Sequence, residues 1–349
     1  MGKHEAWELK QMQSLPLEAK IRMTERRIRD WYDYWDGMVY VSFSGGKDST
    51  VLKHIVDSMF DDVPALFVNT GLEYPEIQKF AMSQKNVVTV RPEMRFDEVI
   101  KTFGYPLISK DVSQAVYDAK TQARRQGIDV RETKLYNRSF NPESEYCQKY
   151  PSYCRARYEF LFDAPFDISY KCCDVMKKKP AKQYEKETGR KPIIGTMASE
   201  SRLRYTKWMQ NGCNAFDSKR PKSQPMSFWT EQDVLQYLKK YDIPYCSVYG
   251  DIVPTTGDDQ IEGQLTTFDI LNDYEGTLLK TTGCDRTGCI FCMFGCYGKK
   301  VWNPTLKETH PNQYRFCIGG GEMIDGKWQP NKDGLGLGKV LDYIGVNYK

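Results

Sequence analysis

One stretch constrains the fold of this chain more than any other, Val39-Tyr-Val-Ser-Phe-Ser-Gly-Gly-Lys-Asp-Ser-Thr50. Its alternating apolar residues, Val39, Val41 and Phe43, predict a buried strand. Residues 50–56 then have the apolar spacing of a helix. A strand, a glycine turn and a helix in this order are typical of α/β proteins that present backbone N–H groups to phosphate.

The turn between that strand and helix, residues 44–49, is predicted to be an anion cradle. Its glycines let the main chain approach a phosphate closely, and the helix N-terminus adds partial positive charge. Lys47 is expected to be a surface lysine that supplies charge and little packing, while Ser44 and Ser49 supply hydroxyls. The Walker A pattern GxxxxGK[ST] is absent.

The chain continues as strands alternating with helices. Strands are predicted at residues 64–69, 87–90 and 191–196, and helices at 75–85 and 231–240. This alternation predicts an α/β fold with a doubly wound, mostly parallel sheet and ligands at the carboxyl ends of its strands.

Three segments are expected along the chain. Residues 1–37 form an N-terminal helical segment, in which a helix at 16–35 packs over the edge of the sheet. Residues 38–250 form the nucleotide-binding domain, with an insertion at about 127–170. Residues 251–349 form a C-terminal region that is rich in cysteine.

Composition and charge narrow the class of protein. The 50 basic and 46 acidic side chains leave a net charge of +4, which implies no bulk attraction to nucleic acid. No signal-peptide core opens the chain, and no apolar run reaches the ~20 residues that span a bilayer. Eleven cysteines at CC and CxxC spacings favour metal or redox use over a disulfide framework. We therefore expect a soluble cytoplasmic protein without membrane contact.

The insertion at about residues 127–170 interrupts the alternation of strands and helices. Tyrosines and phenylalanines alternate there with many charges, and Cys147 and Cys154 lie among them. Basic residues between aromatic ones can bind nucleic acid, but such a segment is more often a lid or a subunit contact. We expect it to set substrate specificity.

Four cysteines lie close together near the C-terminus. Cys284, Cys289, Cys292 and Cys296 have a spacing that permits a zinc ion. The alternative is a [4Fe–4S] cluster that also draws on the adjacent pair Cys172-Cys173.

Several motifs resemble those of the phosphoadenylyl-sulfate (PAPS) reductase family, within the PP-loop, or adenine-nucleotide α-hydrolase, superfamily. Ser44-Gly-Gly-Lys-Asp-Ser49 is similar to its pyrophosphate loop, and Asn69-Thr70-Gly71 followed by Pro75-Glu76 to its second-strand motif. Gly195 through Glu200-Ser201-Arg202-Leu203-Arg204, and Trp229-Thr230 with Asp233-Val234, resemble later family segments.

The resemblance implies an adenine-nucleotide site. Lys47, Asp48, Arg202 and Arg204 would be catalytic, with Asp48 orienting the loop or holding Mg²⁺. The nucleotide, ATP or a relative of it, would be bound by residues of three segments: Ser42, Ser44, Gly45, Gly46, Lys47, Asp48, Ser49, Thr70, Gly71, Gly195, Glu200 and Ser201.

The resemblance also favours the cluster over zinc. Cys172-Cys173 followed by Lys177-Lys178 and Pro180, with the later Cys289 and Cys292, matches how reductases of this family hold iron. The expected ligands are therefore Cys172, Cys173, Cys289 and Cys292, and Cys284 and Cys296 would be neighbours of the cluster or a thiol pair. The remaining cysteines are expected to be structural: Cys147, Cys154, Cys213, Cys246 and Cys317.

The C-terminus departs from the reductases, because no cysteine follows Cys317 and the chain ends Gly345-Val-Asn-Tyr-Lys349. Family members without that tail, such as the DndC-like proteins of DNA phosphorothioation, imply adenylation of an acceptor coupled to sulfur transfer. A sulfonucleotide reductase and a non-catalytic nucleotide- and redox-sensing subunit are the alternatives. A sulfur-donor or carrier protein, a nucleic-acid acceptor and a second copy of the chain are the expected partners besides the nucleotide.

Overall fold

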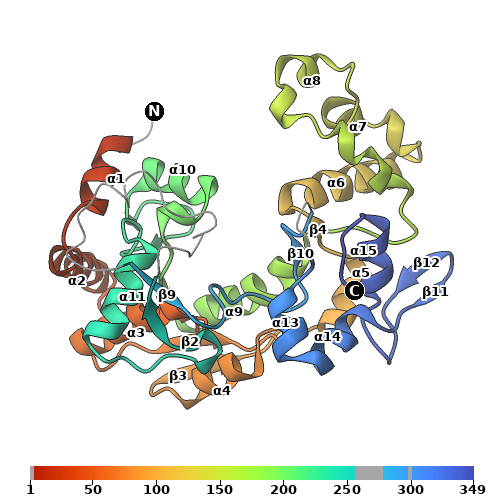
Figure 1. The fold of residues 1–349 in the computed structure, drawn as a ribbon. Helices are drawn as coiled ribbons and strands as arrows, with labels where there is room; N and C mark the ends of the chain where they lie inside the picture. The colour runs from red at the N-terminus through yellow and green to blue at the C-terminus, as the bar shows by residue number, and fades with distance from the viewer. Residues whose placement is uncertain (1–3, 256–277, 298–300) are drawn as a thin grey trace. The chain divides into compact units, whose positions relative to one another are not determined.

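The computed structural model describes residues 4–255, 278–297 and 301–349 (Figure 1). The chain forms two compact units. The first holds residues 1–69, 73–91 and 181–287, and the second holds residues 70–72, 92–180 and 288–349. These units follow spatial contact, so the segment boundaries at residues 37 and 250 stay a prediction.

The first unit is built on a sheet of six strands. They are β1 (Val39–Phe43), β2 (Ala65–Val68), β3 (Val87–Val90), β5 (Lys191–Ile194), β6 (Asn214–Ala215) and β7 (Lys222–Ser223). The order is β3-β2-β1-β5-β7-β6, and every pair is parallel except β6 with β7. The predicted α/β class with a mostly parallel sheet is confirmed.

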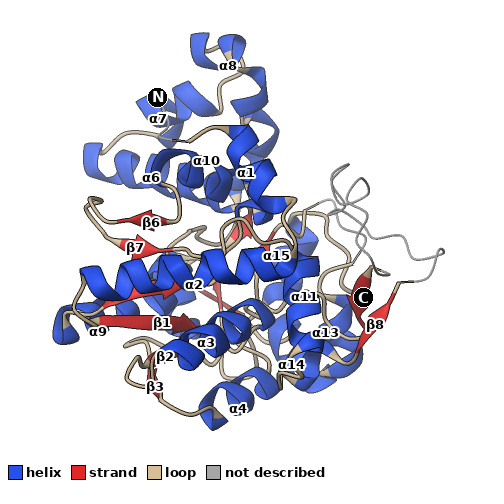
Figure 2. Cartoon of the chain, turned by 90° about the vertical axis from the view of Figure 1, so that its left-hand side faces the viewer, coloured by secondary structure: helices blue, strands red, loops and turns tan. Residues whose placement is uncertain are grey.

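Helices cover both faces of this sheet. They are α1 (Ala6–Gln13), α2 (Leu17–Tyr34), α3 (Lys47–Met59), α4 (Pro75–Ser83), α9 (Lys179–Thr188), α10 (Arg202–Asn211) and α11 (Glu231–Lys240). Figure 2 shows α2 and α3 lying across the strands. An antiparallel pair of strands, β8 (Ile252–Pro254) and β9 (Leu279–Thr281), completes the described part of the unit.

The alternation along β1 assigns its side chains to two cores. Val39, Val41 and Phe43 pack into the large cluster that includes apolar residues of α2, α3 and α11. Tyr40 points to the opposite face and packs with Tyr184 of α9. Both faces of the strand are therefore buried, as expected for a central parallel strand.

A buried ion pair joins α2 to α11. The Lys20 ammonium lies 2.7 Å from the Asp233 carboxylate, and both side chains are almost fully excluded from solvent. Asp233 also accepts a hydrogen bond from the Thr230 N–H at 2.7 Å, which caps α11. Asp233 of the Asp233-Val234 segment therefore has a structural role, because it joins α2 to α11 and caps α11.

The second unit is mostly helical. Its elements are α5 (Phe96–Phe103), β4 (Leu107–Ile108), α6 (Lys110–Gln126), α7 (Lys134–Ser139), α8 (Glu145–Lys149), β10 (Met293–Phe294), α13 (Pro304–Thr309), α14 (Pro311–Ile318), β11 (Glu322–Ile324), β12 (Lys327–Gln329) and α15 (Leu337–Tyr343). β4 pairs in parallel with β10, so residues far apart in sequence lie side by side. A π-helical turn, Asp174–Lys178, leads into α9.

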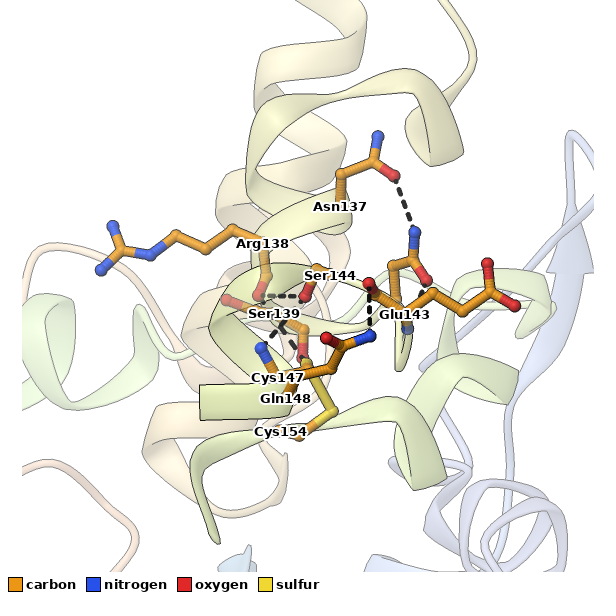
Figure 3. The surroundings of a disulfide bond; sticks show 9 residues. Asn137, Arg138, Ser139, Glu143, Ser144, Cys147, Gln148 and Cys154 are labelled. Atoms are coloured by element: carbon orange, nitrogen blue, oxygen red, sulfur yellow. Dashed lines mark hydrogen bonds between the residues drawn. A yellow bond between two sulfur atoms is a disulfide. The ribbon is translucent and has the colours of Figure 1, made fainter. Parts of the chain in front are cut away.

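One disulfide is present in the described part of the chain, between Cys147 and Cys154 (Figure 3). It joins α8 to the turn that follows it in the insertion. The general expectation of metal or redox use over disulfides is thus corrected for this pair. A disulfide does agree with the structural role that was expected for Cys147 and Cys154 in particular. No helix among the described residues is long and apolar enough to cross a membrane.

Candidate functional site

The loop 44–49 lies where the topology predicts a ligand site. It follows β1, whose neighbours β2 and β5 lie on its two sides, so it occupies the point at which the strand order reverses. Its backbone is held by its own hydroxyls. The Ser44 N–H donates to Ser49 Oγ at 3.2 Å, and Ser49 Oγ donates to the Gly46 carbonyl at 2.9 Å. α3 starts within this loop at Lys47, and its N-cap residue, Gly46, has no side chain to cap it.

Two glycines allow the loop its close contacts. Gly45 has φ +74°, and a Cβ there would lie 3.1 Å from both the side chain and the carbonyl oxygen of Ile77 in α4. A Cβ at Gly195, directly after β5, would lie 3.1 Å from the Asp48 carbonyl oxygen. The backbone conformation of Gly45 therefore favours glycine, and at Gly195 a side chain would crowd the Asp48 carbonyl.

Lys47 is buried rather than a surface lysine, with 5 % of its surface exposed. Its ammonium forms an ion pair with the Glu231 carboxylate at the start of α11. It also donates to the Asp285 carbonyl oxygen at 2.5 Å. The expectation of an exposed lysine that does little packing is wrong, because α11 and the segment around residue 285 cover the loop.

Three further residues at the loop were missed from the sequence. The Lys47 N–H donates to Tyr249 Oη at 3.3 Å, and this hydroxyl lies 2.6 Å from Thr287 Oγ1. Arg286 lies next to Thr287 and forms a 2.5 Å ion pair with Glu200. No local pattern could have found them, since Tyr249 is 202 residues from Lys47 along the chain.

Asp48 carries a buried carboxylate oxygen, Oδ1, that has no hydrogen-bond partner among the described residues. Burial raises the pKa of this carboxyl, and the positive charge of Lys47 opposes that rise. A buried polar atom without a partner is costly unless a ligand meets it. The position therefore fits a cation such as Mg²⁺, which prefers carboxylate oxygen.

The segment 200–204 combines structural contacts with charge. The Glu200 carboxylate accepts the Met197 N–H at 2.8 Å and forms an ion pair with Arg204. Ser201 caps α10 by accepting the Arg204 N–H at 3.3 Å. Burial lowers the pKa of Arg204, whereas Arg202 is exposed. Glu200, Ser201 and Arg204 therefore form one connected group around the start of α10.

Three further predicted nucleotide-binding residues belong neither to the loop 44–49 nor to the segment 200–204. Ser42 lies on β1, on the face opposite to Val41 and Phe43. Thr70 and Gly71 belong to the second compact unit, where Thr70 Oγ1 accepts the Leu72 N–H at 3.2 Å. Their role in nucleotide binding stays a prediction.

The four expected cluster ligands line a single small cavity of about 30 Å³ in the second unit. Cys172 and Cys173 come from the segment before the π-helical turn, and Cys289 and Cys292 from the turn before β10. The other lining residues are mostly apolar: Leu72, Phe96, Pro106, Met176, Lys177 and Phe291. Four thiols around one cavity with apolar walls match the donor set of an iron–sulfur cluster.

The adjacent cysteines share a proton. The Cys172 thiol donates toward Cys173 across a sulfur–sulfur distance of 3.9 Å, which lowers the pKa of Cys173 to about 6. The charges of Lys110, Lys177 and Lys178 lower it further, and burial opposes them. The basic residues after the CC pair therefore favour thiolate, the form that binds metal.

The zinc alternative gains no support in the described part of the chain. No group of three or more Cys, His, Asp or Glu side chains there is placed to hold a metal ion, and this holds for the four expected cluster ligands as well. Cys284 lies in the first unit and Cys296 in the second, and neither lines the cavity. That Cys172, Cys173, Cys289 and Cys292 bind iron nevertheless stays a prediction.

Comparison with protein families identifies one matching model. Residues 38–129 and 85–293 match the phosphoadenosine phosphosulfate reductase domain. An uncharacterized protein of Methanocaldococcus jannaschii is 31% identical over 86 residues, which are 23% of this chain and 21% of the relative. The chain thus matches about a fifth of that relative's length.

Three solved structures show weak likeness. The PAPS reductase of Candida auris in a phosphate complex has 15% identity and a TM-score of 0.35, covering 64% of this chain and 82% of its own. The FMN adenylyltransferase of Candida glabrata has 11% identity and a TM-score of 0.33, with coverages of 70% and 65%. The U34-tRNA thiolase NcsA of Methanococcus maripaludis, with its [4Fe–4S] cluster, has 18% identity and a TM-score of 0.32, with coverages of 65% and 66%. Likeness at this level adds nothing to the fold described above.

Proposed function

The chain belongs to the phosphoadenosine phosphosulfate reductase family, and from this premise we propose that it is an ATP-dependent adenylating enzyme that serves sulfur transfer. The observation that carries the proposal is the pair Lys47 and Asp48. A buried ammonium and a buried, unpartnered carboxylate oxygen adjoin a glycine loop at the carboxyl end of β1. Phosphate and Mg²⁺ together complement these two charges.

The proposed reaction transfers the adenylyl group of ATP. An acceptor oxygen attacks the α-phosphorus, the bond from that phosphorus to the β-bridging oxygen breaks, and pyrophosphate leaves with the electron pair. The acceptor proton passes to solvent, so the products are an adenylated acceptor and pyrophosphate. Displacement of AMP by a sulfur nucleophile would then complete sulfur transfer.

The chain's residues would serve this reaction by binding and by charge. The loop N–H groups and the Lys47 ammonium would hold the pyrophosphate part of ATP and stabilise the charge it gains. Asp48 would hold Mg²⁺ or orient the loop. Arg204 and Arg202 would reach a phosphate or the acceptor from the start of α10.

A [4Fe–4S] cluster would be held by Cys172, Cys173, Cys289 and Cys292, because all four thiols line the same cavity. When bound, the cluster would supply iron and sulfur to handle the transferred sulfur atom. The lysines after Cys173 would favour the thiolates that anchor it.

The reductase alternative needs a thiolate that can reach sulfonucleotide sulfur. The last cysteine of the sequence, Cys317, is fully buried in α14, and burial raises its pKa far above the usual range. Such a thiol is a poor nucleophile. Cys317 is therefore unsuited to the role of that thiolate.

We expect thioredoxin with APS or PAPS to yield no sulfite. ATP with the proper acceptor should yield pyrophosphate, and also AMP when a sulfur nucleophile displaces it from the adenylated acceptor. Sulfite release and pyrophosphate release are the two measurements. A thioredoxin-dependent sulfite signal that disappears in Cys317→Ser would restore the reductase assignment. If the protein binds ATP but releases no pyrophosphate with any class of acceptor, the non-catalytic sensing subunit would be favoured instead.

Glu231→Gln is expected to tighten the binding of pyrophosphate and ATP without Mg²⁺ by about tenfold. In the free protein Glu231 neutralises Lys47, so phosphate has to compete with a carboxylate for the same ammonium. Replacing it with a neutral amide removes a competitor whose contribution is on the order of 1.4 kcal/mol. Calorimetric titration in EDTA measures the change.

Glu308→Gln, in α13, is the matched control, because Glu308 is exposed and forms no ion pair in the described part of the chain. Its affinity should equal that of the wild type. Weaker pyrophosphate binding in Glu231→Gln would contradict the competing role and indicate that Glu231 itself assists the ligand.

A further inference from the structure

The insertion carries a disulfide-stapled surface, which we name the tyrosine module and define as residues 134–158. It comprises α7, α8 and the turn Pro151–Tyr153, and Cys147–Cys154 closes it (Figure 3). The Ser144 hydroxyl reinforces it by accepting the Cys147 N–H at 3.1 Å and donating to the Arg138 carbonyl at 3.3 Å. Side chains on this module are therefore presented from an ordered backbone.

Some aromatic side chains of the module are buried in its core, and others are exposed to solvent. Tyr136 and Phe140 are buried and pack against Phe162. Tyr150 and Tyr153, in contrast, expose 42% and 47% of their surface at the stapled turn. Two exposed tyrosines three positions apart offer flat faces to a planar ligand.

Three cations of the module lie over tyrosine rings, one of them over Tyr150. The Arg138 guanidinium lies 4.7 Å from the Tyr146 ring centre, the Lys149 ammonium 5.6 Å from Tyr150, and the Arg157 guanidinium 4.6 Å from Tyr158. Among the described residues none of these three cations forms an ion pair with a carboxylate. Figure 3 shows the Arg138 side chain extending away from the disulfide.

Other arginines nearby are neutralised. Arg155 pairs with Asp111 at 2.6 Å, and Arg131, just before the module, pairs with Asp163 at 2.8 Å. The module holds five basic and two acidic residues, in a chain whose net charge is only +4. Positive charge is therefore concentrated here, although the whole chain is near neutral.

We propose that the tyrosine module binds single-stranded nucleic acid. Bases would stack on Tyr150 and Tyr153, and phosphates would contact Arg138, Lys149 and Arg157. Stacking on aromatic rings combined with cations along the backbone is how proteins hold unpaired strands. Such binding does not require ATP turnover, so an oligonucleotide assay and a pyrophosphate assay can fail independently.

The test is fluorescence anisotropy with labelled 12-nucleotide oligo(U), oligo(dT) and a duplex of equal length, using the full chain at low salt. Either single strand should bind more tightly than the duplex, and the two single strands distinguish RNA from DNA. Tyr150→Ala/Tyr153→Ala should weaken single-strand binding by about tenfold or more. Tyr150→Phe/Tyr153→Phe should restore it, because phenylalanine keeps the stacking face.

The cations provide a second, independent readout. Arg138→Gln, Lys149→Gln and Arg157→Gln should each weaken binding on every sequence and flatten the salt dependence by about one charge. Tyr241→Ala is the matched control, because Tyr241 is 43% exposed and lies under the Lys240 ammonium, as Tyr150 lies under Lys149. It should bind like the wild type.

Three results would overturn the proposal. They are no binding of any oligonucleotide at low salt, unchanged binding in the double tyrosine-to-alanine variant, and an equal loss in Tyr241→Ala. Duplex binding as tight as single-strand binding would likewise exclude stacking as its basis.

Discussion

Lys47→Ala is expected to weaken ATP and pyrophosphate binding by about a hundredfold or more. Lys47 carries the positive charge of the loop, and its ammonium is already desolvated between Glu231 and the Asp285 carbonyl. A lost hydrogen bond from a charged donor costs about 3 kcal/mol, which corresponds to about two powers of ten in affinity. Isothermal titration with ATP and with α,β-methylene ATP measures the loss.

Lys53→Ala is the matched control for this variant. Lys53 lies in the same helix, is equally buried at 5 % exposure, and is also paired with a carboxylate, that of Asp57. It lies outside the loop, so its removal should leave nucleotide affinity unchanged.

Lys47→Ala also leaves Glu231 without its partner, which can destabilise the fold. Thermal unfolding of both lysine variants therefore accompanies the titrations, and Lys47→Ala/Glu231→Gln removes the unpaired carboxylate. ATP binding of wild-type strength in a folded Lys47 variant would refute the nucleotide site.

Anaerobically purified protein should be brown, contain iron and inorganic sulfide in equal amounts, and absorb near ~400 nm as thiolate-bound clusters do. Cys172→Ser and Cys289→Ser should each lose most of this absorbance. The reason is that both side chains line the one cavity to which all four expected ligands contribute. Metal and sulfide analysis with the visible spectrum gives the readout without any activity assay.

Two buried cysteines serve as controls for the spectrum. Cys213 lies in the first unit and Cys317 in α14, and neither lines the cavity. Cys213→Ser and Cys317→Ser should remain brown. Stoichiometric zinc without iron would contradict the cluster and return the ligand set to Cys284, Cys289, Cys292 and Cys296.

Elements with strong local signals could be predicted from the sequence. The strand at 39–43 followed by a glycine turn and a helix is present as expected. The helix expected at 16–35 is α2, Leu17–Tyr34, with Ile28 and Trp31 fully buried. α11 spans Glu231–Lys240 with its Thr230 cap as predicted. Apolar periodicity, glycine and capping residues act within a few positions, so they can be recognised without the rest of the fold.

Contacts between distant segments were decided by the tertiary structure alone. The partner of Lys47, Glu231, lies 184 residues away, and the partner of Lys20, Asp233, lies 213 residues away. Neither pair has a local signature, because any of the many acidic residues could satisfy a lysine. The burial of Lys47 follows from these contacts, which is why a glycine-rich turn suggested an exposed side chain.

The arrangement of the cysteines also depends partly on local sequence and partly on the tertiary structure. The sequence by itself determined which cysteines occur as CC and CxxC pairs, since that is a matter of spacing. Only the fold decided that Cys172 and Cys173 share a cavity with Cys289 and Cys292, and that Cys147 bonds to Cys154 instead of remaining a free thiol. The parallel pairing of β4 with β10 accompanies that convergence. Such a pairing depends on how the whole unit packs, and no local sequence pattern specifies it.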